Sequence, residues 1–131
     1  MILYQSKNQR VERLSGFLKV SWLETEEMDD ATYRAELLRQ VELIEAERPE
    51  AMFFDTASFA FVIKPETQVW NNETILARVV RTPLRKVAML VSADLFSQVS
   101  IEQNMEEEST GAFATRFFED EASALAWLLK G

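Results

Sequence analysis

The sequence predicts an α/β fold, with a mostly parallel β-sheet, an antiparallel N-terminal β-hairpin and about four helices. Two short apolar runs, Ala51 to Asp55 and Val87 to Val91, lack polar alternation, which is typical of strands covered on both faces. Segments with an apolar residue every three or four positions alternate with these runs, as helices do between parallel strands. The three glycines and three prolines are scattered and mark no linker or repeat. We therefore expect residues 1–131 to form a single domain.

The N-terminal segments predict the hairpin. Arg10 to Leu14 and Phe17 to Leu23 flank the dipeptide Ser15-Gly16, in which glycine permits the positive φ of a tight turn. Apolar residues alternate after this turn, as they do in a strand. Met1 to Gln5 is either a further short strand or an extended arm, and nothing local distinguishes the two.

Two helices are indicated in the middle of the chain. Asp29 or Asp30 can cap the first, which ends before Pro49. Its expected inward residues are Tyr33, Leu37, Val41 and Ile44. Pro65 suits the first turn of the second helix, because the N–H that proline lacks is not needed there. The apolar residues expected in that helix are Val69, Trp70, Leu76 and Val80.

The last third of the chain predicts a helix, a strand and a final helix. Asp94 can cap the helix from Leu95 to about Glu107, and Phe113 to Phe118 is typical of a strand. The final helix runs from Glu121 to Lys130, with Gly131 as a plausible stop. Its expected inward residues are Ala122, Leu125, Leu128 and Leu129.

Charge and composition exclude several classes of function. The net charge of −8, from 22 acidic and 14 basic residues, repels phosphate backbones and makes nucleic acid an unfavourable partner. We interpret the local basic group as an ordinary solvated helix end and loop; it comprises Arg78, Arg81, Arg85 and Lys86. No apolar run is long enough for membrane insertion, and the N-terminus lacks a secretion signal, so we expect a cytoplasmic protein. The chain has no cysteine, which removes disulfides and thiolate metal sites.

Three segments resemble the STAS (sulfate transporter and anti-sigma factor antagonist) family, also called SpoIIAA-like, and especially its small stand-alone bacterial members. They are AMFFDTASFAFVIKPETQVW, KVAMLVSADLFSQVSIEQNMEEE and ATRFFEDEASALAWLL. The order of elements follows the family over nearly the whole chain. The resemblance implies a regulatory domain that binds a protein partner. It also implies a likeness to lipid-binding Sec14-type domains.

The family's phosphorylation switch does not carry over to this chain. In anti-sigma factor antagonists an aspartate ends a central strand, as Asp55 does here, and a motif with a phosphorylatable serine opens the next helix. The corresponding positions are Ile63 to Glu66, and Lys64 stands where the hydroxyl is needed. Thr67 is the nearest hydroxyl, and we interpret it as helix surface.

The residue types argue against an enzyme. Without histidine or cysteine, the chain lacks the commonest general base and the soft metal ligands, and we expect no catalytic residue, metal or cofactor. Asp55 ends a strand where α/β proteins place binding crevices, but we favour the interpretation that it caps the following loop. The consecutive run Glu106 to Glu108 points in different directions on a helix and is interpreted as solvated surface.

An excess of apolar residues indicates a contact surface instead. Phe59, Phe61 and Val62 fall in a connection that is ordinarily polar, so this segment either folds inward or meets a partner. Ile101 and Met105 form a second apolar stripe on their helix, which covers an edge of the domain or lies in a homodimer interface or ligand groove. The expected binding residues are Asp55, Thr56, Ser58, Phe59, Phe61, Lys64, Thr67, Ser92, Asp94, Ile101 and Met105.

Two functions follow from these observations. The first is a non-catalytic STAS-like interaction or regulatory module whose partner is either an unidentified protein or a second copy of this chain, as a homodimer. The alternative is a carrier or sensor of a small apolar ligand, in which the aromatic residues line a cavity.

Overall fold

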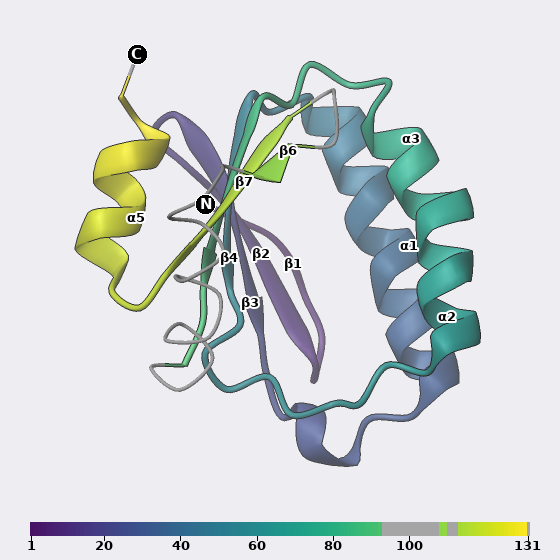
Figure 1. Cartoon of the computed structure of the whole chain (residues 1–131). Coiled ribbons are helices and arrows are strands. Elements are labelled where there is room, and N and C mark those ends of the chain that lie inside the picture. The colour runs from purple at the N-terminus through teal and green to yellow at the C-terminus, as the bar shows by residue number, and fades with distance from the viewer. Residues whose placement is uncertain (93–107, 110–112, 131) are drawn as a thin grey trace.

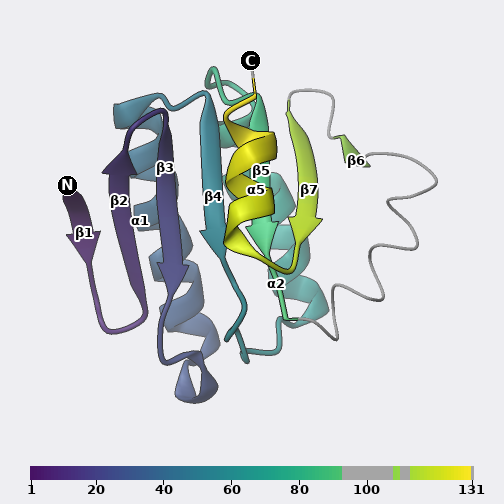
Figure 2. The same cartoon turned by 90° about the vertical axis from the view of Figure 1, so that its left-hand side faces the viewer.

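The computed structural model describes residues 1–92, 108–109 and 113–130. Within these residues, seven strands form one sheet in the order β1-β2-β3-β4-β5-β7-β6 (Figures 1 and 2). The strands are β1 (Ile2–Gln5), β2 (Gln9–Leu14), β3 (Phe17–Trp22), β4 (Ala51–Asp55), β5 (Lys86–Leu90), β6 (Glu108–Ser109) and β7 (Ala114–Phe118). The helical segments are η1 (Thr25–Glu27), α1 (Asp30–Glu47), α2 (Pro65–Trp70), η2 (Asn71–Leu76), α3 (Ala77–Val79) and α5 (Glu121–Leu128).

The strand directions confirm the predicted fold class. β1, β2 and β3 are antiparallel neighbours, whereas β3, β4, β5 and β7 run parallel to one another. The short β6 adds an antiparallel edge beside β7. The sheet is therefore mixed, with its parallel part in the centre and its antiparallel hairpin at one side.

The N-terminal hairpin forms where the sequence predicts it. Leu14 pairs with Phe17 across the turn, and Gly16 has a φ of 90°, a conformation that glycine adopts without strain. Ile2–Gln5 pairs with β2, so the first residues form a short strand rather than an extended arm.

Helix α1 also agrees with its prediction. The Asp29 side chain accepts a hydrogen bond of 2.7 Å from the backbone N–H of Thr32 and caps the helix, which ends just before Pro49. The four residues expected to face inward are all buried, and so are the polar residues Glu36 and Gln40.

The second helix begins at Pro65 as predicted, and only some of its apolar residues are buried. Val69 and Val80 are 54% and 38% exposed, while Ile75 and Val79 are buried. Residues Asn71–Leu76 form a π-helix, whose wider turn shifts the buried face out of the spacing expected of an α-helix. In the preceding α2, Thr67 is buried against α1. Residues two positions apart lie on nearly opposite sides of a helix, so Val69 points away from α1.

The helices cover both faces of the sheet (Figure 1). Here the inner face is the one that faces α1 and α2–α3, and the outer face is the one that faces α5. Figure 2 shows α5 in front of β4, β5 and β7. The outer face and α5 form one compact core of Phe17, Ala51, Phe53, Ala88, Phe118, Ala124 and Leu128.

The buried face of α5 is narrower than predicted. Ala124 and Leu128 are buried and Leu125 is half-buried, but Ala122 and Leu129, which were expected to face inward, are exposed. Because α5 crosses only the parallel part of the sheet, few of the residues of α5 contact the strands. The Lys86 ammonium donates hydrogen bonds of 3.0 and 2.9 Å to the backbone oxygens of Trp127 and Lys130. These bonds hold the C-terminal end of α5 against the sheet.

The helix expected after Asp94 and the stop at Gly131 lie outside the described residues. Of the run Glu106 to Glu108, only Glu108 is described, and it begins β6. Within the described part of the chain, no helix is long and apolar enough to cross a membrane.

Candidate functional site

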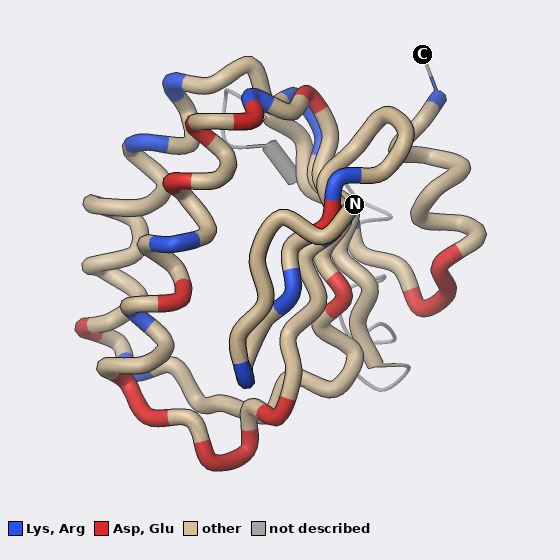
Figure 3. Tube along the Cα trace, turned by 180° about the vertical axis from the view of Figure 1, so that it is seen from behind, with Lys and Arg blue, Asp and Glu red and all other residues tan. Residues whose placement is uncertain are grey.

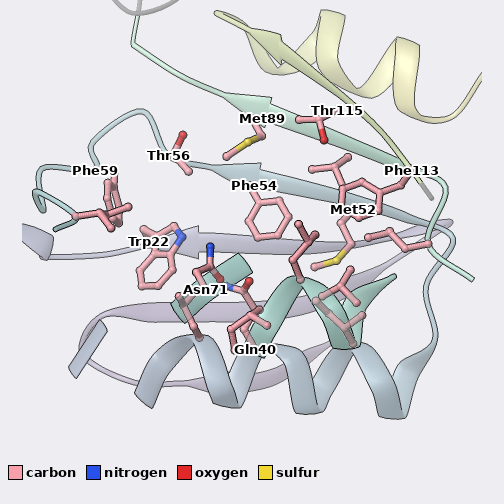
Figure 4. Close-up of a pocket in the computed structure, with 18 of the residues that line it drawn as sticks. Trp22, Gln40, Met52, Phe54, Thr56, Phe59, Asn71, Met89, Phe113 and Thr115 are labelled. Atoms are coloured by element: carbon pink, nitrogen blue, oxygen red, sulfur yellow. The ribbon is translucent and has the colours of Figure 1, made fainter. Parts of the chain in front are cut away.

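A cavity of about 510 Å³ lies between the inner face of the sheet and the helical layer (Figure 4). Side chains from β3, β4, β5, β7, α1, η2 and α3 line it, together with residues of the connecting loops. The sheet contributes mainly Met52, Phe54, Val87, Met89, Thr115 and Phe117. The helices contribute mainly Tyr33, Leu37, Gln40, Ile44, Asn71 and Ile75. The cavity is partly open to solvent, and its volume and mainly apolar lining are typical of a small-molecule site.

The alternation of strand side chains explains which residues reach the cavity. Neighbours along a strand point to opposite faces, so Phe53 packs under α5 whereas Phe54 lines the cavity. The same rule places Ala88 in the outer core and Met89 in the cavity wall. The two apolar runs that predict central strands thus supply both a packed core and a ligand-sized space.

Four aromatic rings form a cluster at one end of this layer. Tyr33 lies 5.8 Å from Trp22 and 5.0 Å from Phe61, measured between ring centroids, and Phe59 lies 5.4 Å from Trp22. The backbone N–H of Ala60 donates to the Thr25 hydroxyl at 2.9 Å and fixes the loop against the body of the domain. The segment that carries Phe59 and Phe61 therefore folds inward, and Phe59 becomes part of the cavity wall.

The polar residues after β4 hold the loop in place. Asp55 accepts a hydrogen bond of 3.3 Å from the backbone N–H of Ala57, in agreement with its interpretation as a loop cap. The Thr56 hydroxyl donates to the backbone oxygen of Leu90 at 2.8 Å, and Thr56 also lines the cavity. Ser58 is exposed.

Thr67 is fully buried, so its interpretation as helix surface is wrong. Its hydroxyl donates to the carboxylate of Asp30 and accepts a hydrogen bond of 3.2 Å from Arg34. The Thr67 hydrogen bond, together with the Arg34 guanidinium, lowers the pKa of Asp30 below its usual 3.8. Thr67 therefore joins α2 to α1, and its hydroxyl is not accessible to a kinase in the folded domain. Lys64 directly precedes α2 and is exposed.

Of the remaining predicted site residues, only Ser92, which follows β5, lies within the described residues. Ser92 is exposed. Asp94, Ile101 and Met105 lie outside the described residues, so the second apolar stripe and the homodimer that it indicates stay predictions.

The basic group around the end of α3 is largely paired. Arg78 forms a bidentate ion pair with Glu45, and Arg85 lies 3.2 Å from Glu50. Figure 3 shows acidic residues gathering between β3 and α1, at the opposite end of the helical layer from this basic group. The pairing agrees with an ordinary solvated helix end. Among the described residues, no three acidic side chains converge as ligands for a metal ion.

Sequence reasoning missed most of the cavity lining. No local pattern predicts a ligand-binding role for Trp22, Gln40, Asn71 or Met89. Period-two alternation does predict which side chains of a strand share a face, and so could have grouped Trp22 or Met89 with their neighbours on the inner face. The missing information is the spacing between the helical layer and the sheet, which no local pattern reports.

Comparison with protein-family models, with curated proteins and with solved structures finds no match to this chain. Its class therefore rests on its own architecture, an α/β domain with an apolar cavity between its sheet and one helical layer.

Proposed function

We propose that this protein is a non-catalytic, STAS- or Sec14-like domain that binds a small apolar molecule, as a carrier or sensor, in the cavity between α1–α3 and the sheet. The cavity of about 510 Å³ is the observation that carries this proposal. Its size falls within the range of about 300 to 1,000 Å³ that is common for small-molecule sites.

The lining supports an apolar occupant. Aliphatic and aromatic side chains make up most of the wall, and they come from both the sheet and the helices. Contact between such a surface and an apolar molecule removes both from water, at roughly 25 cal/mol per Å² of buried apolar area. A few polar groups interrupt the wall, as they do in sites that orient their ligand.

In the sequence, the apolar residues of the loop between β4 and α2 allowed a protein interface. In the structure, the packing of this loop favours a ligand site instead. An interface anchor has to be free in the unbound domain, whereas Phe59 and Phe61 pack on Tyr33 and Trp22. Phe59 closes part of the cavity rather than presenting a surface to a partner.

A titration with phenylnaphthylamine, an uncharged apolar dye that fluoresces in dry sites, tests the proposal. We expect saturable binding to the native protein at micromolar concentration. The variant Thr115→Phe places a ring in the cavity and should weaken binding at least tenfold without loss of thermal stability. Arg116→Phe adds the same ring at the next, exposed position and should bind the dye like the native protein.

Two results would contradict the proposal. One is the absence of saturable dye binding, which would mean that protein atoms fill this space in solution. The other is equal binding by Thr115→Phe and the native protein, which would place the dye elsewhere.

A further inference from the structure

The lining of the cavity carries no charge. None of the described residues that line it is aspartate, glutamate, lysine or arginine, and the chain has no histidine. Its one ionisable phenol is Tyr33, and burial, with the nearby Asp30 carboxylate, raises the pKa of Tyr33 to about 12. A charged group that entered this space would lose its hydration without gaining an ionic partner, which is strongly unfavourable.

Three lining side chains nevertheless keep unused hydrogen-bonding capacity. Gln40, which is 6% exposed, donates one amide N–H to Gln9 at 3.2 Å and retains its carbonyl oxygen and a second N–H. Within the described part of the chain, neither the indole N–H of Trp22 nor the side-chain amide of Asn71 has a hydrogen-bond partner. Among the described residues, the only fully buried side-chain atom without a partner is Arg10 Nε, so the free donors and acceptors of these three side chains face space that water or a polar head group can reach.

The fold brings these three side chains to one region of the cavity. Gln9 pairs with Trp22 across β2 and β3, and Gln40 bonds to Gln9, so Trp22 and Gln40 both flank the same residue. Gln9 in turn donates to the backbone oxygen of Glu36 at 2.8 Å, which fixes the Gln40 amide indirectly.

Asn71 approaches from the second helical segment. The pairs Asp30–Thr67 and Glu45–Arg78 align α2–α3 with α1, so Asn71 lies opposite the middle of α1, where Gln40 is found. Figure 4 shows Trp22, Gln40 and Asn71 reaching into the cavity from three different elements. Asn71 also opens the π-helical segment, a rare geometry that recurs at functional sites.

We propose, on the basis of the function proposed above, that the molecule bound here is an uncharged amphiphile rather than an ionised fatty acid. Its apolar body lies against the sheet side chains such as Phe54 and Met89. Its single neutral head, a hydroxyl, carbonyl or ester group, bonds to Trp22, Gln40 and Asn71. A cavity of about 510 Å³ holds a molecule of roughly 15 to 20 non-hydrogen atoms, since a water molecule takes about 30 Å³ of liquid.

Competition between matched probes tests the charge of the head group. Dodecanol and dodecanoate share one alkyl chain and differ in charge at neutral pH. Each is titrated against phenylnaphthylamine bound to the native protein, below the solubility limit of dodecanol and below the concentration at which dodecanoate forms micelles. We expect dodecanol to displace the dye at a concentration at least ten times lower than dodecanoate does.

Two variants test the polar contacts. Asn71→Leu removes one hydrogen-bonding group and should weaken dodecanol about three- to tenfold while the dye binds as before. Gln68→Leu is the control, because Gln68 is exposed on the same helical segment, and it should change neither.

The outcomes separate the two proposals. If the dye binds in the cavity but dodecanoate competes as well as dodecanol, the uncharged head group is wrong and the apolar site stands. Unchanged dodecanol binding in Asn71→Leu would likewise overturn the assigned head-group contact. If the dye does not bind at all, both proposals fail.

Discussion

The two faces of the sheet bury similar apolar residues but pack them in different ways. On the outer face, the small Ala124 is completely buried, so α5 approaches closely and its core is filled. On the inner face, larger side chains such as Tyr33 and Gln40 separate α1 from the strands, and a cavity remains. Burial from water and dense packing are therefore distinct properties. A side chain can be buried from water and still lie beside an open space. We expect the outer face to stabilise the domain and the inner face to bind.

The largest effect is expected from truncating the filled core. Phe53 is completely buried on the outer face, so Phe53→Ala should lower the free energy of unfolding by about 3 to 5 kcal/mol. Met89→Ala should cost less than about 2 kcal/mol, because this side chain lines a space that is already open and has fewer neighbours to lose. Urea denaturation of both variants measures the difference. Equal costs would show that the inner face is packed as densely as the outer face.

Phe61 tests the closed end of the inner layer. It is half-buried and stacks near Tyr33, so Phe61→Ser should lower the free energy of unfolding by about 2 kcal/mol, between the costs of a core and a surface site. The neighbouring Val62 is 83% exposed, and Val62→Ser should stay within about 0.5 kcal/mol of the native protein. Thermal and urea unfolding of the pair are the measurements. A Phe61→Ser variant as stable as the control would restore the view that this ring is a free interface anchor.

Gly16 tests how tightly the end of α5 fits the sheet. Its φ of 90° is unfavourable for other residues, and an added Cβ would lie 3.1 Å from the Cδ2 atom of Leu129. Gly16→Ala should therefore cost about 1 to 2 kcal/mol of stability. Ser15→Ala, at the exposed preceding position, serves as the control and should cost little. If the two variants unfold at the same denaturant concentration, the hairpin and α5 are not closely fitted.

The smallest effect concerns the contact between α1 and α2 beside the cavity. The folded state lowers the pKa of Asp30, so this group stabilises the fold above its unfolded pKa, and the contribution is lost as the pH falls through the folded pKa. Thr67→Val removes the hydrogen bond to Asp30 and should make the loss of stability below about pH 4 shallower. Melting temperatures measured between about pH 6 and pH 3 give the two slopes. Thr56→Val loses a hydroxyl bonded only to a backbone oxygen and should keep the native slope.

Local patterns predicted the order and direction of the elements. The short apolar runs without polar alternation located β4 and β5, and the Asp29 cap and Pro65 located the starts of α1 and α2, because these signals depend on neighbours in the sequence. The same patterns did not indicate which residues of the second helix are buried: Val69 and Val80 are exposed, and Thr67, interpreted as surface, is buried. A π-helical turn and a buried threonine depend on the partner helix, and a single-helix pattern does not contain that information.

The candidate site divides in the same way. The sequence by itself determined that Asp55 ends a central strand and that Phe59 and Phe61 follow it in a connection that is ordinarily polar. Only the tertiary structure decided that those rings fold inward and that Trp22, Gln40 and Asn71 meet in one cavity. The physical reason is that strand and cap signals act over a few residues. The size of a cavity depends on the distance between layers, and side chains far apart in the chain set that distance together.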